Sequence, residues 1–187
     1  MARIHAPLVK ILVAGASQVG KTSLVHKYVF KDFIDVSPTI GVNFAQKIVY
    51  GEEGPLNLSI WDLSGEDRFR FLMPQFCSGA SAVILVFDQT RPNSLAEGTS
   101  WLNLLQRYAH PSHRHAIILA GNKADLSSCV SRQEIQSFCK THEIAGFVSC
   151  SAKTDTRVDL VFETLCTTIQ QNLPEPTDAL TRYLRAT

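Results

Sequence analysis

The stretch GASQVGKT, Gly15 to Thr22, follows the apolar run LVKILVA and precedes a segment with helical periodicity. It fits the pattern GxxxxGK[ST], which arises by chance in on the order of 1% of chains this long. Glycines let the backbone curl so that successive amides point inward, and the helix that begins near Gly20 adds its positive dipole end. A merely tight turn would not require Lys-Thr after the second glycine, so the stretch predicts a phosphate-binding loop.

The side chains of this loop add charge and a hydroxyl to what the backbone offers. Lys21 would place its charge against the β- and γ-phosphates of a nucleotide, and Thr22 would offer its hydroxyl to Mg²⁺. Lys21 is therefore a candidate catalytic residue as well as a binding residue. The predicted nucleotide-binding residues of the loop are Gly15, Ser17, Gln18, Val19, Gly20, Lys21, Thr22 and Ser23.

Around the loop, apolar runs alternate with segments of helical period, as in a parallel sheet with crossover helices. Near-continuous apolar runs indicate buried strands, whereas VNFAQKIVY alternates as an edge strand does. The turn-like GEEGP behind it indicates a hairpin with the next run. The predicted strands are Leu8 to Gly15, Val42 to Tyr50, Leu56 to Asp62, Ala82 to Asp88, His115 to Gly121 and Gly146 to Cys150.

Four segments fit helices, with Ser131 and Glu134 at capping-box spacing and Pro92 near a first turn. The predicted helices are Gly20 to Phe30, Pro92 to Tyr108, Ser131 to His142 and Arg157 to Asn172. Together the elements predict an α/β fold of the P-loop NTPase type: a six-stranded, mostly parallel sheet with one antiparallel edge strand and helices on both faces. Residues 1–173 form the predicted domain, and residues 174–187 a short tail.

Composition limits the class of protein. The 187 residues suit one domain with a full core, and 45% apolar with 19% charged residues is typical of a soluble globular chain. A net charge of +1 gives no reason to expect nucleic acid or an anionic membrane as main partner. The five cysteines form no CxxC pair, which argues against a disulfide framework or a zinc knuckle. We predict a cytoplasmic protein, since no apolar stretch approaches a membrane span.

Asp62 ends a predicted buried strand, where a lone carboxylate is costly unless it is paired or close to a metal. In P-loop NTPases this is the place of the acidic residue that holds Mg²⁺ through its water shell. Asp62 therefore joins Thr22 as a predicted metal residue.

The segment GNKADL, Gly121 to Leu126, follows another buried strand and discriminates among bases. One carboxylate can accept from both N1-H and the exocyclic amino group of guanine, whereas adenine would leave a buried Asp unsatisfied. Asp125 would carry that choice, and the stem of Lys123 could lie along the ring. An ordinary strand-to-loop turn is the alternative for Asn122, Lys123 and Asp125. Because the same sequence has a P-loop and, at Asp62 to Gly65, a DxxG motif, base recognition is the favoured interpretation.

With these motifs assembled, the chain resembles the small Ras-like GTPases, and within them the Rab family most closely. The resemblance runs from about Leu8 to Asn172 and rests on GASQVGKT, TIGVNF (Thr39 to Phe44), WDLSGEDRFR, FDQTRPNSL, GNKADL and SCSAK. TIGVNF is close to a TIGVDF-like signature, and WDLSGEDRF stands in place of a WDTAGQERF-like one. The resemblance implies a Mg²⁺-dependent GTP/GDP-binding switch that hydrolyses GTP and acts in vesicle trafficking.

The resemblance also implies roles at matching positions. Thr39 would bind Mg²⁺ and meet the γ-phosphate in the first switch, and Gly65 would sense that phosphate through its amide. Phe33 lies where the family keeps an aromatic that stacks on guanine. The residues implied to brace the base are Ser151, Ala152 and Lys153.

The chain departs from the family at Glu66, where the DxxGQ motif normally has glutamine. The glutamine amide accepts from the attacking water and can donate to the transition state. An ionised carboxylate has no proton to donate and stands near the charge of the γ-phosphate. We therefore predict slow intrinsic hydrolysis, with Glu66, Gly65 and Lys21 as catalytic residues. The alternative is that Glu66 takes up a proton or acts as a base, so that turnover survives.

The resemblance implies partners as well. Phe44, Trp61 and Phe76 match the aromatic triad that Rab-like proteins show to effectors, with core packing as the alternative. Exchange factors and GTPase-activating proteins would bind the switch regions of a monomer. Rabs usually end in a tail with prenylated cysteines, whereas the last cysteine here, Cys166, lies in a predicted helix. Either the sequence is truncated, or the protein meets membranes peripherally, through partners only.

Three functions compete on this sequence. The first is a GTP-hydrolysing switch in which GTP and Mg²⁺ order Thr39 and Gly65. The second is a GTP-binding interaction module with little or no hydrolysis, supported by Glu66 and the missing lipid anchor. The third is a P-loop kinase or ATPase, which GNKADL disfavours.

Overall fold

The computed structural model describes residues 6, 8–34, 39–51, 54–108 and 116–172. The predicted tail at 174–187, and its boundary with the domain, lie outside the described residues. None of the helices within these ranges combines the length and the apolar character that crossing a bilayer requires.

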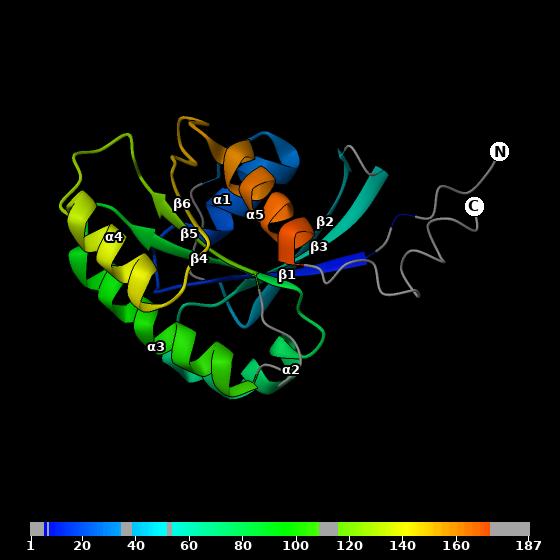
Figure 1. Cartoon of the computed structure of the whole chain (residues 1–187), viewed down its shortest axis with the longest axis horizontal. Coiled ribbons are helices and arrows are strands. Elements are labelled where there is room, and N and C mark those ends of the chain that lie inside the picture. The colour runs from blue at the N-terminus through cyan, green and yellow to red at the C-terminus, as the bar shows by residue number, and fades with distance from the viewer. Residues whose placement is uncertain (1–5, 7, 35–38, 52–53, 109–115, 173–187) are drawn as a thin grey trace.

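A six-stranded sheet runs through the middle of the molecule in the order β2-β3-β1-β4-β5-β6 (Figure 1). Its strands are β1 (Leu8–Ala14), β2 (Val42–Gly51), β3 (Gly54–Leu63), β4 (Ala82–Asp88), β5 (Ala116–Asn122) and β6 (Gly146–Ser149). β2 pairs antiparallel with β3, and the other neighbours pair parallel. The predicted sheet, with its antiparallel edge strand and hairpin, is confirmed.

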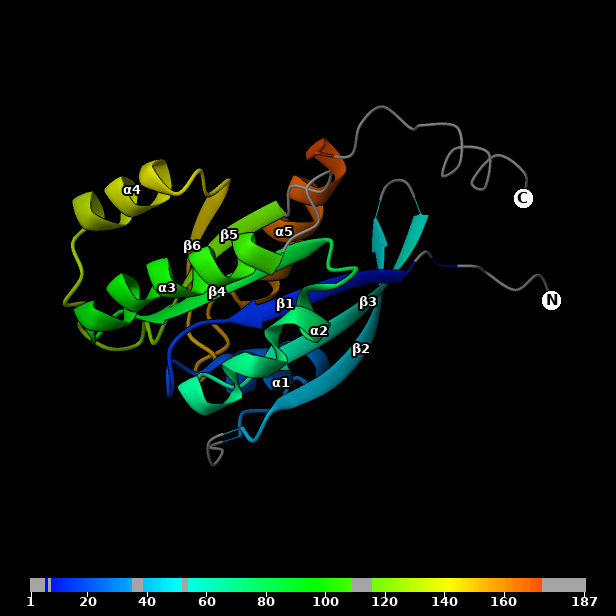
Figure 2. The ribbon, with the colours of Figure 1, turned by 90° about the horizontal axis from the view of Figure 1, so that it is seen from below.

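Helices cover both faces of the sheet, as predicted (Figures 1 and 2). They are α1 (Lys21–Phe30), α2 (Met73–Cys77), α3 (Pro92–Tyr108), α4 (Arg132–Thr141), α5 (Val158–Asn172) and the 3-10 helix η1 (Asp67–Leu72). α1 and α5 pack on one face, and α2, α3 and α4 lie on the other. The sequence did not predict η1 or α2, because segments this short carry too few turns for a helical period to be recognised.

The side chains of the central strands divide between two cores. In β1, Ile11 and Val13 pack with α1 and α5, whereas Leu12 and Ala14 pack with α2 and α3. All four are fully buried. Because strand side chains alternate between faces, a strand covered on both faces must be apolar throughout. This is the physical reason why the buried strands read as unbroken apolar runs.

The parallel strands all end at one edge of the sheet, so the loops that follow β1, β3, β4 and β5 meet there. Open α/β sheets bind ligands at this carboxyl edge. The fold therefore gathers segments that are far apart in the sequence around one place.

Candidate nucleotide-binding site

A cavity of about 420 Å³ lies at this edge of the sheet. Its walls come from the loops after β1, β3, β5 and β6, the start of α1, and the residues that follow α1 and precede β2. The lining residues are Ser17, Gln18, Gly20, Lys21, Thr22, Ser23, Phe33, Thr39, Ser64, Gly65, Glu66, Asn122, Lys123, Asp125, Leu126, Ser151, Ala152 and Lys153. The structure thus brings the predicted phosphate, switch and base segments into one cavity.

A few residues differ from the prediction in their placement. Ser64 and Leu126 line the cavity but were not predicted, although both lie inside the motifs WDLSGEDRFR and GNKADL. Gly15, Val19 and Asp62 were predicted and lie behind the wall instead of in it. Each of them contacts a lining residue: the carbonyls of Gly15 and Val19 accept from Lys21 and Asn122, and Asp62 accepts from Thr22.

Two glycines allow the phosphate-binding loop to pass close to other backbone. Gly15 has φ +140°, and a Cβ there would lie 2.1 Å from the carbonyl oxygen of Val86. A Cβ at Gly65 would lie 2.5 Å from the backbone nitrogen of Ser17. Any side chain at either position would require the backbone to move. The second contact brings the loop after β3 directly against the phosphate-binding loop.

Lys21 is buried at the start of α1, and its ammonium group lies against the loop. Nζ donates to the carbonyl oxygens of Gly15 at 2.9 Å and Ala16 at 2.7 Å. Burial lowers the pKa of Lys21 to about 8; the charge of Asp62 opposes this shift and that of Arg91 adds to it. A polyphosphate beside Nζ would favour the charged form.

Thr22, Thr39 and Asp62 come together as the predicted metal residues. Thr22 Oγ1 donates to Asp62 Oδ2 at 2.5 Å, and the two threonine hydroxyl oxygens are 2.7 Å apart. Burial raises the pKa of Asp62 to about 6. Asp62 Oδ1 is buried and has no hydrogen-bond partner among the described residues. Hydroxyl and carboxylate oxygens with one acceptor left over fit a hard cation such as Mg²⁺.

Glu66 and Gly65 line the cavity, where Gly65 lies against the phosphate-binding loop. The Glu66 side chain is 28% exposed, and its Oε2 lies 2.7 Å from Nε of Arg68. The site therefore places a carboxylate, paired with a guanidinium, on the wall where the prediction expected the catalytic residue. Its negative charge is partly offset by that neighbour.

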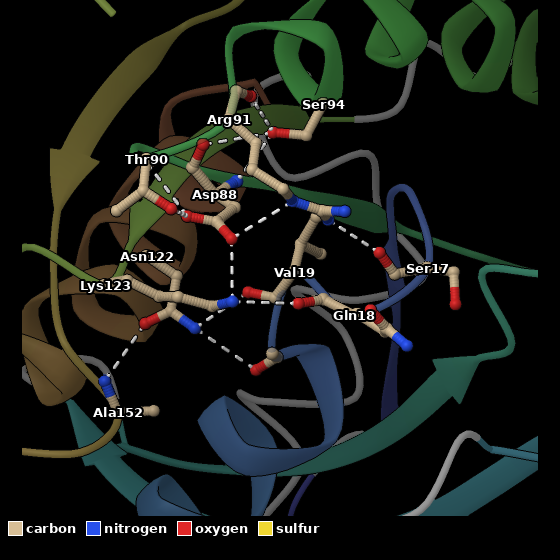
Figure 3. Close-up of polar contacts among 11 residues, drawn as sticks. Ser17, Gln18, Val19, Asp88, Thr90, Arg91, Ser94, Asn122, Lys123 and Ala152 are labelled. Atoms are coloured by element: carbon tan, nitrogen blue, oxygen red, sulfur yellow. Dashed lines mark hydrogen bonds and ion pairs between the residues drawn. The ribbon is translucent and has the colours of Figure 1, made fainter. Parts of the chain in front are cut away.

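Asn122 acts as a brace between three loops (Figure 3). Its side chain is buried; Nδ2 donates to the carbonyl of Val19 at 2.9 Å, and Oδ1 accepts from the amide of Ala152 at 3.0 Å. Asp125 lines the cavity, and its Oδ1 accepts from Ser151 Oγ at 2.6 Å. The hydroxyl of Ser151 thus orients a carboxylate that can accept from a ligand.

Lys123 connects the base segment to the phosphate-binding loop. Its Nζ lies 2.7 Å from Asp88 Oδ2 and donates to the carbonyl of Gln18 at 3.1 Å. Burial alone would raise the pKa of Asp88, but hydrogen bonds from Lys123 and Thr90 hold that pKa below its ordinary value. The prediction missed Asp88, although an aspartate ending a buried apolar strand was the same signal that identified Asp62.

The remaining predicted residues also take their places on the cavity wall. Phe33 is 37% exposed, and Lys153 is exposed. Ser23 Oγ donates to the carbonyl of Ile34 at 3.0 Å, which ties α1 to the segment that follows it. The aromatic ring and the lysine stem offer apolar surface to a planar base.

Phe44, Trp61 and Phe76 form a contiguous row over β2, β3 and α2. The ring centroids of Phe44 and Trp61 are 4.5 Å apart, and those of Trp61 and Phe76 are 5.8 Å apart. Phe44 is 62% exposed, whereas Phe76 is 9% exposed and belongs to a core. The row therefore begins at the surface and ends in the core.

Comparisons with known proteins agree with this geometry. The model of the Ras family matches residues 10–171. The chain is 35% identical over 173 residues to the Ras-related protein Rab-17 of Homo sapiens, a match that covers 91% of this chain and 81% of that protein. The chain belongs to the Ras family of small GTPases, GTP-binding switch proteins, and is Rab-like.

Proposed function

We propose that this protein is a Mg²⁺-dependent GTP/GDP switch whose intrinsic hydrolysis of GTP is slow. The observation that carries the proposal is the position of Glu66, which lines the cavity next to Gly65, a residue packed against the phosphate-binding loop. The family usually has glutamine there.

Different residues of the cavity bind different parts of the nucleotide and its metal ion. Lys21 and the amides of the loop hold the β- and γ-phosphates, and Asp125 accepts from guanine. Thr22 and Thr39 would hold Mg²⁺ directly, and Asp62, which lies behind Thr22, would orient its water shell. The metal, when bound, offsets the charge of the phosphates. Thr39 and Gly65 meet the γ-phosphate, so its loss releases both segments.

The charge of Glu66 opposes hydrolysis. Two negative charges about 4 Å apart repel by about 4 kcal/mol at the effective dielectric of a protein surface. The nearby guanidinium of Arg68 reduces this repulsion, and it also occupies one oxygen of the carboxylate. Glu66 accordingly orients the attacking water poorly and stabilises none of the charge in the transition state.

Single-turnover hydrolysis of bound GTP by the parent and by Glu66→Gln tests this proposal. The neutral amide removes the repulsion and restores a donor, so we expect hydrolysis to be about tenfold faster or more, tenfold being worth about 1.4 kcal/mol of barrier. Asp67→Asn is the matched control, because Asp67 is 83% exposed and pairs with Arg70 at 2.9 Å. If Glu66→Gln is no faster than the parent, Glu66 does not limit the rate.

A GTP-binding interaction module with little or no hydrolysis is the second candidate. The Glu66–Arg68 contact favours it, because a carboxylate engaged with a guanidinium is a poor acceptor for water. The nucleotide that copurifies with the protein separates the two candidates. Mostly GDP indicates a chain that hydrolyses during expression, and mostly GTP indicates the module.

Effectors are proposed to bind the surface end of the aromatic row. Phe44 is exposed and lies in contact with the ring of Trp61, so a partner could cover both rings together. Exchange factors and GTPase-activating proteins would bind the segments around Thr39 and Gly65. In this proposal the protein meets membranes through such partners or through a lipid-bearing tail.

A further inference from the structure

One buried carboxylate outside the cavity joins two cations to the phosphate-binding loop (Figure 3). The Asp88 side chain is 1% exposed, and its Oδ2 lies 3.2 Å from Arg91 Nε and 2.7 Å from Lys123 Nζ. Arg91 Nη2 donates to the carbonyl of Ser17 at 2.8 Å, and Lys123 Nζ donates to the carbonyl of Gln18 at 3.1 Å. Two successive carbonyls of the loop therefore accept from cations that the same buried carboxylate holds.

The loop needs such contacts because of its own geometry. Gln18 has φ 62°, in the left-handed region that costs a residue with a side chain of order 1 kcal/mol. When successive amides turn toward a phosphate, their carbonyls turn toward the opposite side of the loop and require donors there. Arg91 and Lys123 supply these donors at the two positions where the loop has neither glycine nor a buried side chain.

Asp88, which contacts both cations, is itself held in place by hydrogen bonds. The backbone amide and the hydroxyl of Thr90 donate to Asp88 Oδ1 at 2.9 and 2.7 Å. The Asp88 amide donates to Ser94 Oγ at 3.0 Å, and the Arg91 amide donates to the Asp88 carbonyl at 3.0 Å. Both oxygens of the buried carboxylate are thus engaged, which holds Arg91 in place at the start of α3.

We propose that Arg91 is a positioning residue that holds the outer side of the phosphate-binding loop and thereby slows the release of bound nucleotide. Arg91 is not among the residues that line the cavity in the described part of the chain, so it acts through Ser17. Its planar guanidinium donates to Asp88 and to Ser17 from two different nitrogens. A lysine has a single ammonium and a shorter reach, and it cannot reproduce this bridge. The proposal rests on the nucleotide binding proposed above.

The rate at which a fluorescent GDP analogue dissociates, measured with Mg²⁺ present, tests this role. In Arg91→Ala we expect dissociation about five- to tenfold faster, as for the loss of the charge-assisted hydrogen bond to Ser17, which is partly exposed to solvent. Arg91→Lys keeps a cation beside Asp88 but loses the contact with Ser17, so it should dissociate nearly as fast. Arg107→Ala, which removes an exposed arginine near the end of α3, the helix that follows Arg91, should keep the parental rate.

The dissociation rates decide the proposal, and thermal unfolding of the same variants shows whether each of them is folded. A parental dissociation rate in Arg91→Ala, with or without a lower Tm, overturns the proposal, and so does a parental rate in Arg91→Lys. If Arg91→Ala does not fold, Arg91→Lys decides alone. Failure of the parent itself to bind the GDP analogue contradicts the proposed function as well, whereas binding with unchanged rates in both variants contradicts this inference only.

Discussion

Carboxylates at the carboxyl edge of the sheet differ in their tasks because their neighbours differ. Asp62 has one buried oxygen with no hydrogen-bond partner among the described residues, which fits its predicted role beside a metal ion. Asp88 has both oxygens engaged by its own chain, which suits a residue that fixes others. Glu66 lies on the cavity wall beside a guanidinium. Burial and partners, more than residue type, thus assign the roles.

The cysteines differ in burial, and the reactivity of their thiols tests this difference. Burial raises the pKa of Cys150 to about 12 and that of Cys77 to about 11, and it also raises the pKa of Cys139 and Cys166. A raised pKa leaves less thiolate at a given pH, so these thiols should react slowly at pH 8 and faster as pH rises. Cys129 is exposed.

We therefore expect one rapidly reacting thiol in the folded protein at pH 8. The measurement uses an aromatic disulfide reagent whose released thiolate absorbs visible light. Cys129→Ser should abolish the rapid phase, and denaturation should expose the remaining thiols. Several rapid thiols in the folded parent, or a rapid phase that survives in Cys129→Ser, would show that the described burial is wrong.

Most residues that line the cavity could be predicted because the residues of each motif lie within a few positions of one another in the sequence. The contact of Arg91 with Ser17 joins residues 74 positions apart, and no spacing within a motif indicates it. That Phe44 is exposed and Phe76 is nearly buried could not be predicted either, since the exposure of each ring depends on what packs against it. Such properties come from tertiary contacts, not from local pattern.

At the scale of elements, capping signals were sufficient for α4. Ser131 Oγ accepts from the amide of Glu134 at 3.2 Å, and Glu134 Oε2 accepts from the amide of Ser131 at 2.7 Å. This reciprocal capping box satisfies amides that the helix itself leaves free. By contrast, α2 depends on the burial of Met73 and Phe76 in a core, which no local sequence pattern predicts, and η1 has no buried residue at all.

Ser131→Ala should lower the stability of the protein by about 1 kcal/mol, because it removes the side-chain acceptor at the helix N-terminus. For a domain of this size the Tm should fall by about 2–4 °C. Ser131→Thr, which keeps a hydroxyl, is the control and should stay close to the parent. Ser131 does not line the nucleotide cavity, so GDP affinity should be unchanged in both variants. Equal losses of Tm in both would argue against the cap.

At the scale of the whole molecule, the alternation of apolar runs and helical segments was enough to predict the sheet and both helical layers. The parallel strands then dictate that the loops after β1, β3 and β5 meet, although more than a hundred residues separate the first from the last. The cavity at this edge of the sheet is thus a consequence of topology. Its detailed shape is not, because it depends on contacts such as that of Gly65 with the phosphate-binding loop.

Equilibrium binding of GDP, GTP and ATP to the nucleotide-stripped protein, with Mg²⁺ present, tests the central claim most directly. The account predicts tight binding of GDP and GTP and much weaker binding of ATP, since Asp125 finds two donors side by side only on guanine. Asp125→Ala should weaken GDP binding and leave the fold intact. A folded protein that binds neither guanine nucleotide, or that prefers ATP, would contradict the account.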